Sequence, residues 1–204
     1  MKILVFAMLL VLAIPVAQAG LHLEPYVGYL SGKSKVTILG TEVKDTYKTA
    51  MIGARVGLGM MGVSAGVDYS MSPGTFELKQ DTPATSAGPD KEKYKNLGIF
   101  VAFKFPVLFR VWGTYFLNSE MKVDTVGAGT GSSVDDKLKG KGFAVGAGFT
   151  GLPIVAINLE YRRITFDELD DGATGVTTSL PTAAVSEFKT NEVMLSISAP
   201  FNLF

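Results

Sequence analysis

Few side chains in this sequence are suited to acid–base or metal chemistry. The single histidine is His22, and the absence of cysteine excludes disulfides, thiolate metal sites and a thiol nucleophile. The densest acidic cluster is Asp167-Glu168-x-Asp170-Asp171. It lacks the glycine at position six and the glutamate at position twelve of a calcium loop, and a solvated loop is the better interpretation. We therefore expect no metal and no cofactor, and no glycine motif for nucleotides is present.

Eight other charged residues share a pattern, since each takes the place of a small or polar residue in an alternating segment. Four are acidic and four are basic, so the set is balanced. We expect them to lie inside the protein, where unpaired charges would be costly and paired ones form a polar plug. A catalytic or ion-conducting arrangement of the same groups is the alternative. The predicted interior charge network comprises Glu24, Arg55, Asp68, Lys104, Arg110, Glu160, Arg162 and Glu192.

The elements that must position these charges are strands, because apolar residues recur at every second position in eight segments. The segments span about 8 to 12 residues, which suits a membrane strand better than the shorter strands of soluble sandwiches. In the fifth segment the second set includes Arg110, Trp112, Thr114 and Asn118. The predicted strands lie at 21–29, 49–58, 62–71, 96–105, 107–118, 142–149, 155–162 and 192–201.

The two faces of these strands differ in a way that indicates a membrane barrel. One set is apolar, whereas the other is mostly glycine, alanine, serine and threonine with a few charges. Small residues leave room inside a narrow barrel for a few large ones, so the apolar set should face lipid. Tight turns at Met60-Met61, Pro106 and Gly151-Leu152-Pro153 alternate with long links near 31–46, 73–93, 119–138 and 167–187. Short periplasmic turns and long external loops are the outer-membrane pattern.

Composition and the first residues agree with export. The chain has 204 residues with 19 basic and 19 acidic side chains, so its charge gives no attraction to nucleic acid. Met1-Lys2, the apolar run Ile3–Ala17 and Ala17-Gln18-Ala19 resemble a signal peptide cleaved before Gly20, although a short membrane anchor would share some of these features. We expect 1–19 to be the cleaved signal peptide and 20–204 the barrel, with both of its ends in the periplasm.

Outward-facing residues also change along each strand. Aromatic residues form two candidate girdles, with Tyr29, Tyr69, Tyr115 and Tyr161 on the loop side and Phe103, Phe105, Phe109, Phe149 and Phe201 on the turn side. Lysine and arginine residues lie beyond the tyrosines on the loop side. We predict that they contact lipopolysaccharide phosphates as a ring of point charges. Ordinary interfacial snorkelling is an equal alternative. This collar comprises Lys48, Lys95, Lys139, Lys141, Arg163 and Lys189.

The whole segment 20–204 resembles the small outer-membrane β-barrels of the OmpA transmembrane domain, OmpX and opacity-protein kind. The resemblance rests on Leu21-x-Leu23-Glu24-Pro25-Tyr26-Val27-Gly28-Tyr29, on the eight-strand layout and on the terminal phenylalanine. It implies an all-β, eight-stranded antiparallel up-and-down transmembrane β-barrel. It also implies that the barrel-assembly machinery reads an aromatic residue of the last strand, and both Phe201 and Phe204 are candidates.

The function expected from the sequence is a non-enzymatic one. Lipid A enzymes of this architecture need a histidine near the outer rim, whereas His22 lies near the periplasmic end in the inward phase. We expect a monomeric integral outer-membrane protein of a Gram-negative bacterium, in contact with lipid and lipopolysaccharide. Its four long surface-exposed loops would provide a structural or surface-interaction role with a possible extracellular partner. The alternative is a narrow ion or small-solute channel, similar to OmpW.

Overall fold

A computed structural model describes residues 20–77, 79–80, 90–126, 133–183, 185–186 and 188–203. Every regular element within them is a strand, and no described helix has the length and apolar character that a membrane crossing requires. The expected signal peptide, residues 1–19, lies outside the described residues, as do Phe204 and parts of three of the long links. The strands are β1 (Gly20–Ile38), β2 (Thr41–Met60), β3 (Val63–Met71), β4 (Phe76–Glu77), β5 (Lys79–Gln80), β6 (Lys91–Lys104), β7 (Phe109–Thr125), β8 (Lys137–Phe149), β9 (Ala156–Asp170), β10 (Thr177–Ser179), β11 (Phe188–Ser198) and β12 (Phe201–Leu203).

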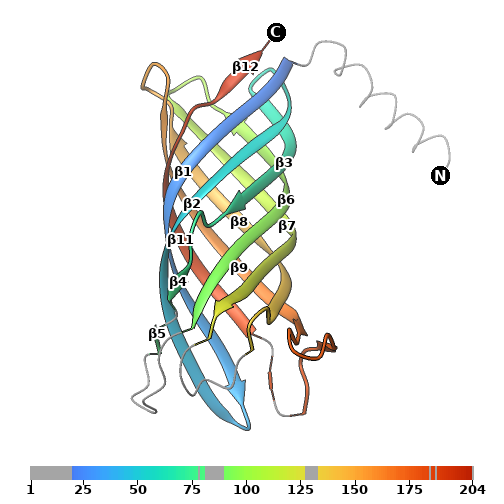
Figure 1. The fold of residues 1–204 in the computed structure, drawn as a ribbon. Coiled ribbons are helices and arrows are strands. Elements are labelled where there is room, and N and C mark those ends of the chain that lie inside the picture. The colour runs from blue at the N-terminus through green and yellow to red at the C-terminus, as the bar shows by residue number, and fades with distance from the viewer. Residues whose placement is uncertain are drawn as a thin grey trace, which may run out of the picture.

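Eight of these strands close into an antiparallel ring. The order is β1-β2-β3-β6-β7-β8-β9-β11, and β11 pairs with β1 to complete the circle (Figure 1). The four remaining strands are short and extend the ring at its ends. Closure leaves the long strands without a free edge, which is what a strand needs in order to cross lipid. The predicted fold class is thus confirmed.

The residues of each long strand alternate between lumen and outer surface. Along β9 the exposed side chains of Ile157, Leu159 and Tyr161 alternate with the buried Asn158, Glu160 and Arg162. Nearly all exposed large apolar side chains of the middle of the barrel belong to the outward set. The outer belt is therefore apolar and the lumen polar, the reverse of a water-soluble barrel.

The first hairpin differs from the sequence prediction. Residues 31–46 were expected to form a long loop, but β1 and β2 continue through them to a two-residue turn at Leu39-Gly40. Both turn residues have positive φ, 49° and 82°, as a type I′ turn requires. The hairpin projects beyond the other strands at the end opposite the C-terminus (Figure 1).

The interior of this projecting end is apolar. Its buried residues include Val36, Tyr47, Phe76, Phe166 and Phe188. Outward positions at the same height carry lysines, among them Lys33 and Lys35 on β1. At this end the polar residues face outward and the apolar residues face inward, the reverse of the arrangement in the lipid belt. The reversal follows because the outer surface here meets water instead of lipid.

Two further predictions of strand shape were wrong. Asn118 was expected to face inward, but a β-bulge between Phe116 and Ser119 leaves both Leu117 and Asn118 exposed. The last segment was expected to be continuous, whereas it is divided into β11 and β12 at Ala199-Pro200. Proline has no N–H for the ladder, so a break there has a direct cause.

Candidate functional site

The interior charges occupy two facing walls of the lumen. Glu24, Arg55 and Asp68 are direct cross-strand partners on β1, β2 and β3, so an acid–base–acid row runs across three strands. On the other wall, Arg162 of β9 is the cross-strand partner of Glu192 of β11. Alternation alone directs these side chains inward, and antiparallel register aligns them.

Arg55 joins the two walls. Its Nε donates to Asp68 Oδ2 at 3.0 Å and its Nη1 to Glu24 Oε1 at 3.4 Å. Its Nη2 reaches across the lumen to Glu160 Oε2 at 2.6 Å. The guanidinium also lies 4.5 Å from the ring centroid of Trp112, within cation–π range.

Arg110 forms the layer nearest the chain termini. It holds the carboxylate of Glu24 with both terminal nitrogens, and the Nη1 to Oε2 distance is 2.5 Å. Its Nη2 also donates to Asn158 Oδ1 at 2.8 Å and Ser198 Oγ at 3.0 Å. Bidentate pairing of this kind fixes the relative orientation of the guanidinium and the carboxylate and also neutralises their charges.

Arg162 and Glu192 form the opposite layer. Arg162 Nε donates to Glu160 Oε1 at 2.5 Å. Glu192 forms no ion pair with any described residue and instead accepts bonds from the hydroxyls of Tyr47, Tyr94 and Thr190. Three arginines are thus matched by three ion-paired carboxylates, and the fourth carboxylate is held by hydroxyl groups.

The network spans the lumen and is buried. Seven of the eight predicted interior charges are at most 4% exposed, and Lys104 alone is exposed, at the mouth beside the termini. Removing so many charges from water is tolerable only when each is paired and hydrogen-bonded. Above the network the lumen is filled by apolar side chains such as Leu30, Met51 and Met194. The arrangement is suited to sealing and bracing a barrel.

His22, the single histidine, lies beside a carboxylate and an aromatic ring. His22 Nε2 lies 3.5 Å from Glu24 Oε2, and its ring contacts Phe100 at a centroid distance of 5.9 Å. Among the described residues, no three histidine or acidic side chains converge as a metal site. In the acidic cluster, Asp170 pairs with Lys139, and Asp171 caps a turn through the N–H groups of Ala173 and Thr174.

Sequence reasoning missed the hydroxyl and indole donors of the network. Trp112 Nε1 donates to Glu160 at 2.6 Å, and the Tyr26 hydroxyl donates to Asp68 at 2.8 Å. Tyr47 and Tyr94, which bind Glu192, lie just beyond the predicted strand ends. Trp112 and Tyr26 occupy inward-facing positions of predicted strands, so their part in the network could have been predicted from the alternation. Tyr47 and Tyr94 lie outside the predicted strands, so theirs could not.

The predicted collar residues all lie on the outer surface, but their surroundings differ. Lys48, Lys95, Lys141 and Arg163 are exposed, and Lys139 and Lys189 are partly covered. Cross-strand pairing links Lys141 to Thr165, Thr165 to Lys189, and Lys189 to Lys35. On the other side of the barrel, Lys95 is opposite Glu120. The basic surface is thus an arc over β8, β9, β11, β1 and β2, and it does not form a full ring.

Comparisons with solved structures agree with this geometry. The chain is similar to neisserial surface protein A (17% identity, TM-score 0.50), with 87% of this chain and 97% of that chain covered. It is similar to OprG from Pseudomonas aeruginosa (13% identity, TM-score 0.55, coverage 90% and 97%). It is also similar to Ail, the attachment invasion locus protein of Yersinia pestis (16% identity, TM-score 0.51, coverage 89% and 99%). No protein-family model matches the sequence, and a search of curated proteins gives no match.

The fold is that of a small outer-membrane β-barrel. The exposed apolar belt is the surface that such a barrel presents to lipid, and it places the protein in the bacterial outer membrane. The belt is bordered on one side by exposed tyrosines, Tyr29, Tyr69, Tyr115 and Tyr161, and on the other by exposed phenylalanines including Phe103, Phe109 and Phe201. In such barrels the end with the short turns and the chain termini is periplasmic, and the end with the long loops is extracellular. The projecting hairpin belongs to the extracellular end.

Proposed function

We propose that the protein is a closed, non-enzymatic scaffold that presents an ordered surface outside the outer membrane for contact with an extracellular partner. The observation that supports this proposal is the buried network of charges that spans the lumen. Arg55 spans it, every arginine of the network is paired with at least one carboxylate, and an apolar plug lies above them. With charged and apolar side chains filling the lumen, and no metal-type cluster among the described residues, the outer end is the part of the barrel best suited to binding a partner.

The outer end has the order that a binding surface needs. The last link folds against the first hairpin, since Thr37 N donates to Ser186 Oγ and Ser186 N donates to the Thr37 carbonyl, both at 2.8 Å. Ile38 forms an isolated bridge with Val185. Val36 and Phe188 are buried beneath this contact. The hairpin is consequently braced by the barrel instead of standing alone.

The hairpin tip supplies the candidate contact. Leu39 is 80% exposed and follows the exposed Ile38. The tip lies ten residues beyond Tyr29, roughly 33 Å along the strand, so these side chains meet water and not lipid. An exposed apolar pair flanked by Lys35, Glu42 and Lys44 has the character of a small contact site for a protein partner.

A single substitution can test this proposal without disturbing the fold. Leu39→Asn removes the apolar side chain and places the favoured Asn-Gly pair in the type I′ turn. Met61→Asn is the matched control, because Met61-Gly62 is the equivalent turn on the periplasmic side, with φ of 51° and 84°. Both variants should give the heat-modifiable band of a folded barrel.

The readouts are adhesion, phage sensitivity and serum survival of cells that express the protein. We expect Leu39→Asn to reduce at least one of these while Met61→Asn leaves all three at the level of the unmodified protein. Equal behaviour of the two variants, with both barrels folded, would refute a contact at the hairpin tip.

A further inference from the structure

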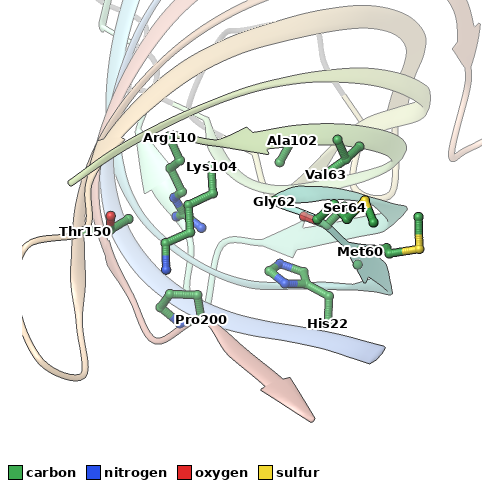
Figure 2. A pocket seen from close by; sticks show the side chains of 12 residues that line it. His22, Met60, Gly62, Val63, Ser64, Ala102, Lys104, Arg110, Thr150 and Pro200 are labelled. Carbon is green, nitrogen blue, oxygen red and sulfur yellow. The ribbon is translucent and has the colours of Figure 1, made fainter. Parts of the chain in front are cut away.

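A cavity of about 220 Å³ opens at the periplasmic mouth of the barrel, below the charge network. It is enclosed by the β2–β3 turn, the periplasmic ends of β6 and β7, Thr150 after β8, and Pro200 between β11 and β12 (Figure 2). The polar side chains of His22, Lys104 and Arg110 extend into this region. On the closed lumen proposed above, the cavity is a dead end that is reached from the periplasm.

Two cations face each other in this cavity. Lys104 and Arg110 are direct cross-strand partners, and both side chains line the cavity wall. Like charges in that position repel one another. The terminal nitrogens of Arg110 are neutralised by Glu24, whereas the Lys104 ammonium has no carboxylate partner in the described part of the chain. The described lining of the mouth therefore carries one excess positive charge.

Hydrogen-bond donors without partners lie in the same wall. Arg110 Nε is buried and has no acceptor, and the buried Thr150 Oγ1 has no partner either. Arg110 lines the inner end of the cavity, so its Nε is a donor for a ligand that reaches this end. Together with the Lys104 ammonium, these atoms offer three donors and no carboxylate acceptor of their own, which is the complement of an oxyanion.

The rest of the lining is apolar and comes from Met60, Met61, Val63, Ala102 and Pro200. We infer that the periplasmic mouth is a binding site for a small monocarboxylate with a short apolar tail. Lys104, Arg110 Nε and Thr150 Oγ1 bind the carboxylate, and the methionines contact the tail. An inorganic phosphate shares the charge but cannot use the apolar wall, so it should bind more weakly.

The single tryptophan provides a readout, because the Arg110 guanidinium carbon lies 5.0 Å from the Trp112 ring centroid. Butyrate and, separately, inorganic phosphate are titrated onto the full mature chain in lipid nanodiscs while Trp112 emission is recorded. We expect a saturable change with butyrate. Lys104→Gln should weaken butyrate binding at least tenfold, and Thr150→Val should weaken it to a lesser degree. Lys93→Gln, on the same strand but paired with Asp124 at the extracellular end, should have no effect.

Absence of saturable butyrate binding, or equal affinity in Lys104→Gln, would overturn the site. Phosphate binding as tight as butyrate would overturn the assignment of an apolar tail. If Lys104→Gln did not assemble, Thr150→Val would decide the question, because it removes one donor without changing a charge. Unaltered affinity in that variant would then contradict the inference.

Discussion

Arg55 Nη2 and Glu160 Oε2 lie 2.6 Å apart, although their strands, β2 and β9, are separated in the ring by β1 and β11. This ion pair crosses the lumen and ties the acid–base–acid row of Glu24, Arg55 and Asp68 to the opposite wall. It makes the interior one connected network, so the removal of one charge leaves several partners without an ion pair or hydrogen bond.

Charge balance should decide how substitutions in the network affect stability. Glu24→Gln and Arg110→Gln each leave an uncompensated buried charge, and each should lower the free energy of unfolding by about 3–5 kcal/mol. The double variant restores neutrality and should be more stable than either single variant. Equilibrium unfolding in urea, in lipid vesicles with Trp112 emission as the signal, measures all three. A double variant whose loss equals the sum of the single losses would argue against the network.

Gly146 makes room for Trp112. The two are cross-strand partners, and a Cβ on Gly146 would lie 2.2 Å from the indole ring. Gly146→Ala should displace the ring, break its bond to Glu160 and cost about 1–3 kcal/mol through overpacking. The emission of Trp112 should shift in the folded barrel. Gly74→Ala is the control, since a Cβ there meets no atom within 4 Å, and an unshifted spectrum in Gly146→Ala would contradict the packing.

Glu92 should make the extracellular end sensitive to pH. Glu92 lies beyond the lipid belt, since the outward residues beside it are Lys91 and Lys93. Burial raises the pKa of Glu92 from 4.5 to about 8, and the negative charges of Asp90 and Asp45 add to the rise. As pH increases from 4.5 to 8, the unfolded state loses this proton first, so the stability of this end falls and then levels off.

Amide exchange at Phe76 and Glu77, which pair with β6 at Glu92 and Lys91, measures this effect. Each unit of difference in pKa corresponds to about 1.4 kcal/mol, or tenfold in an opening equilibrium. We expect opening at pH 8, corrected for intrinsic exchange, to exceed that at pH 5 by at least tenfold, and Glu92→Gln to remove the difference. The same pH dependence in Glu92→Gln would exclude Glu92 as its source.

The basic arc gives a prediction about lipopolysaccharide. Lys141 and Arg163 are exposed, whereas Lys139 is already paired with Asp170 at 2.5 Å. If the arc binds lipid phosphates, Lys141→Glu with Arg163→Glu should weaken lipopolysaccharide binding several-fold, and Lys139→Glu should have a smaller effect. Binding to immobilised lipopolysaccharide is the measurement. Unchanged binding in the double variant would leave interfacial snorkelling as the explanation of these residues.

The lipid-facing half of this barrel could be predicted from sequence because one rule holds throughout it. The outward positions are apolar and the charged residues take inward positions, so Glu24, Arg55, Asp68 and Glu160 could be assigned to the lumen from alternation alone. The rule reverses where the strands enter water, and the segment 31–46 was therefore mistaken for a loop. The bulge at Leu117-Asn118 shifts the phase locally, and no residue type marks it.

The partners inside the network were beyond sequence reasoning for a different reason. Which acid meets Arg55 depends on register and on the tilt of the strands across the lumen. Neighbours such as Asp68 follow from adjacent strands, but the Glu160 contact depends on the closed ring. Tyr47 and Tyr94 bind Glu192 only because β2 and β6 continue past the belt.

Single-channel recording in a planar bilayer tests the sealed barrel most directly. The unmodified protein, confirmed as folded by its heat-modifiable band, should produce no stable conductance steps across the range of potentials that the bilayer withstands. Stable steps whose size changes when Arg110 or Arg162 is replaced would show that ions pass through the network, and would contradict a closed scaffold.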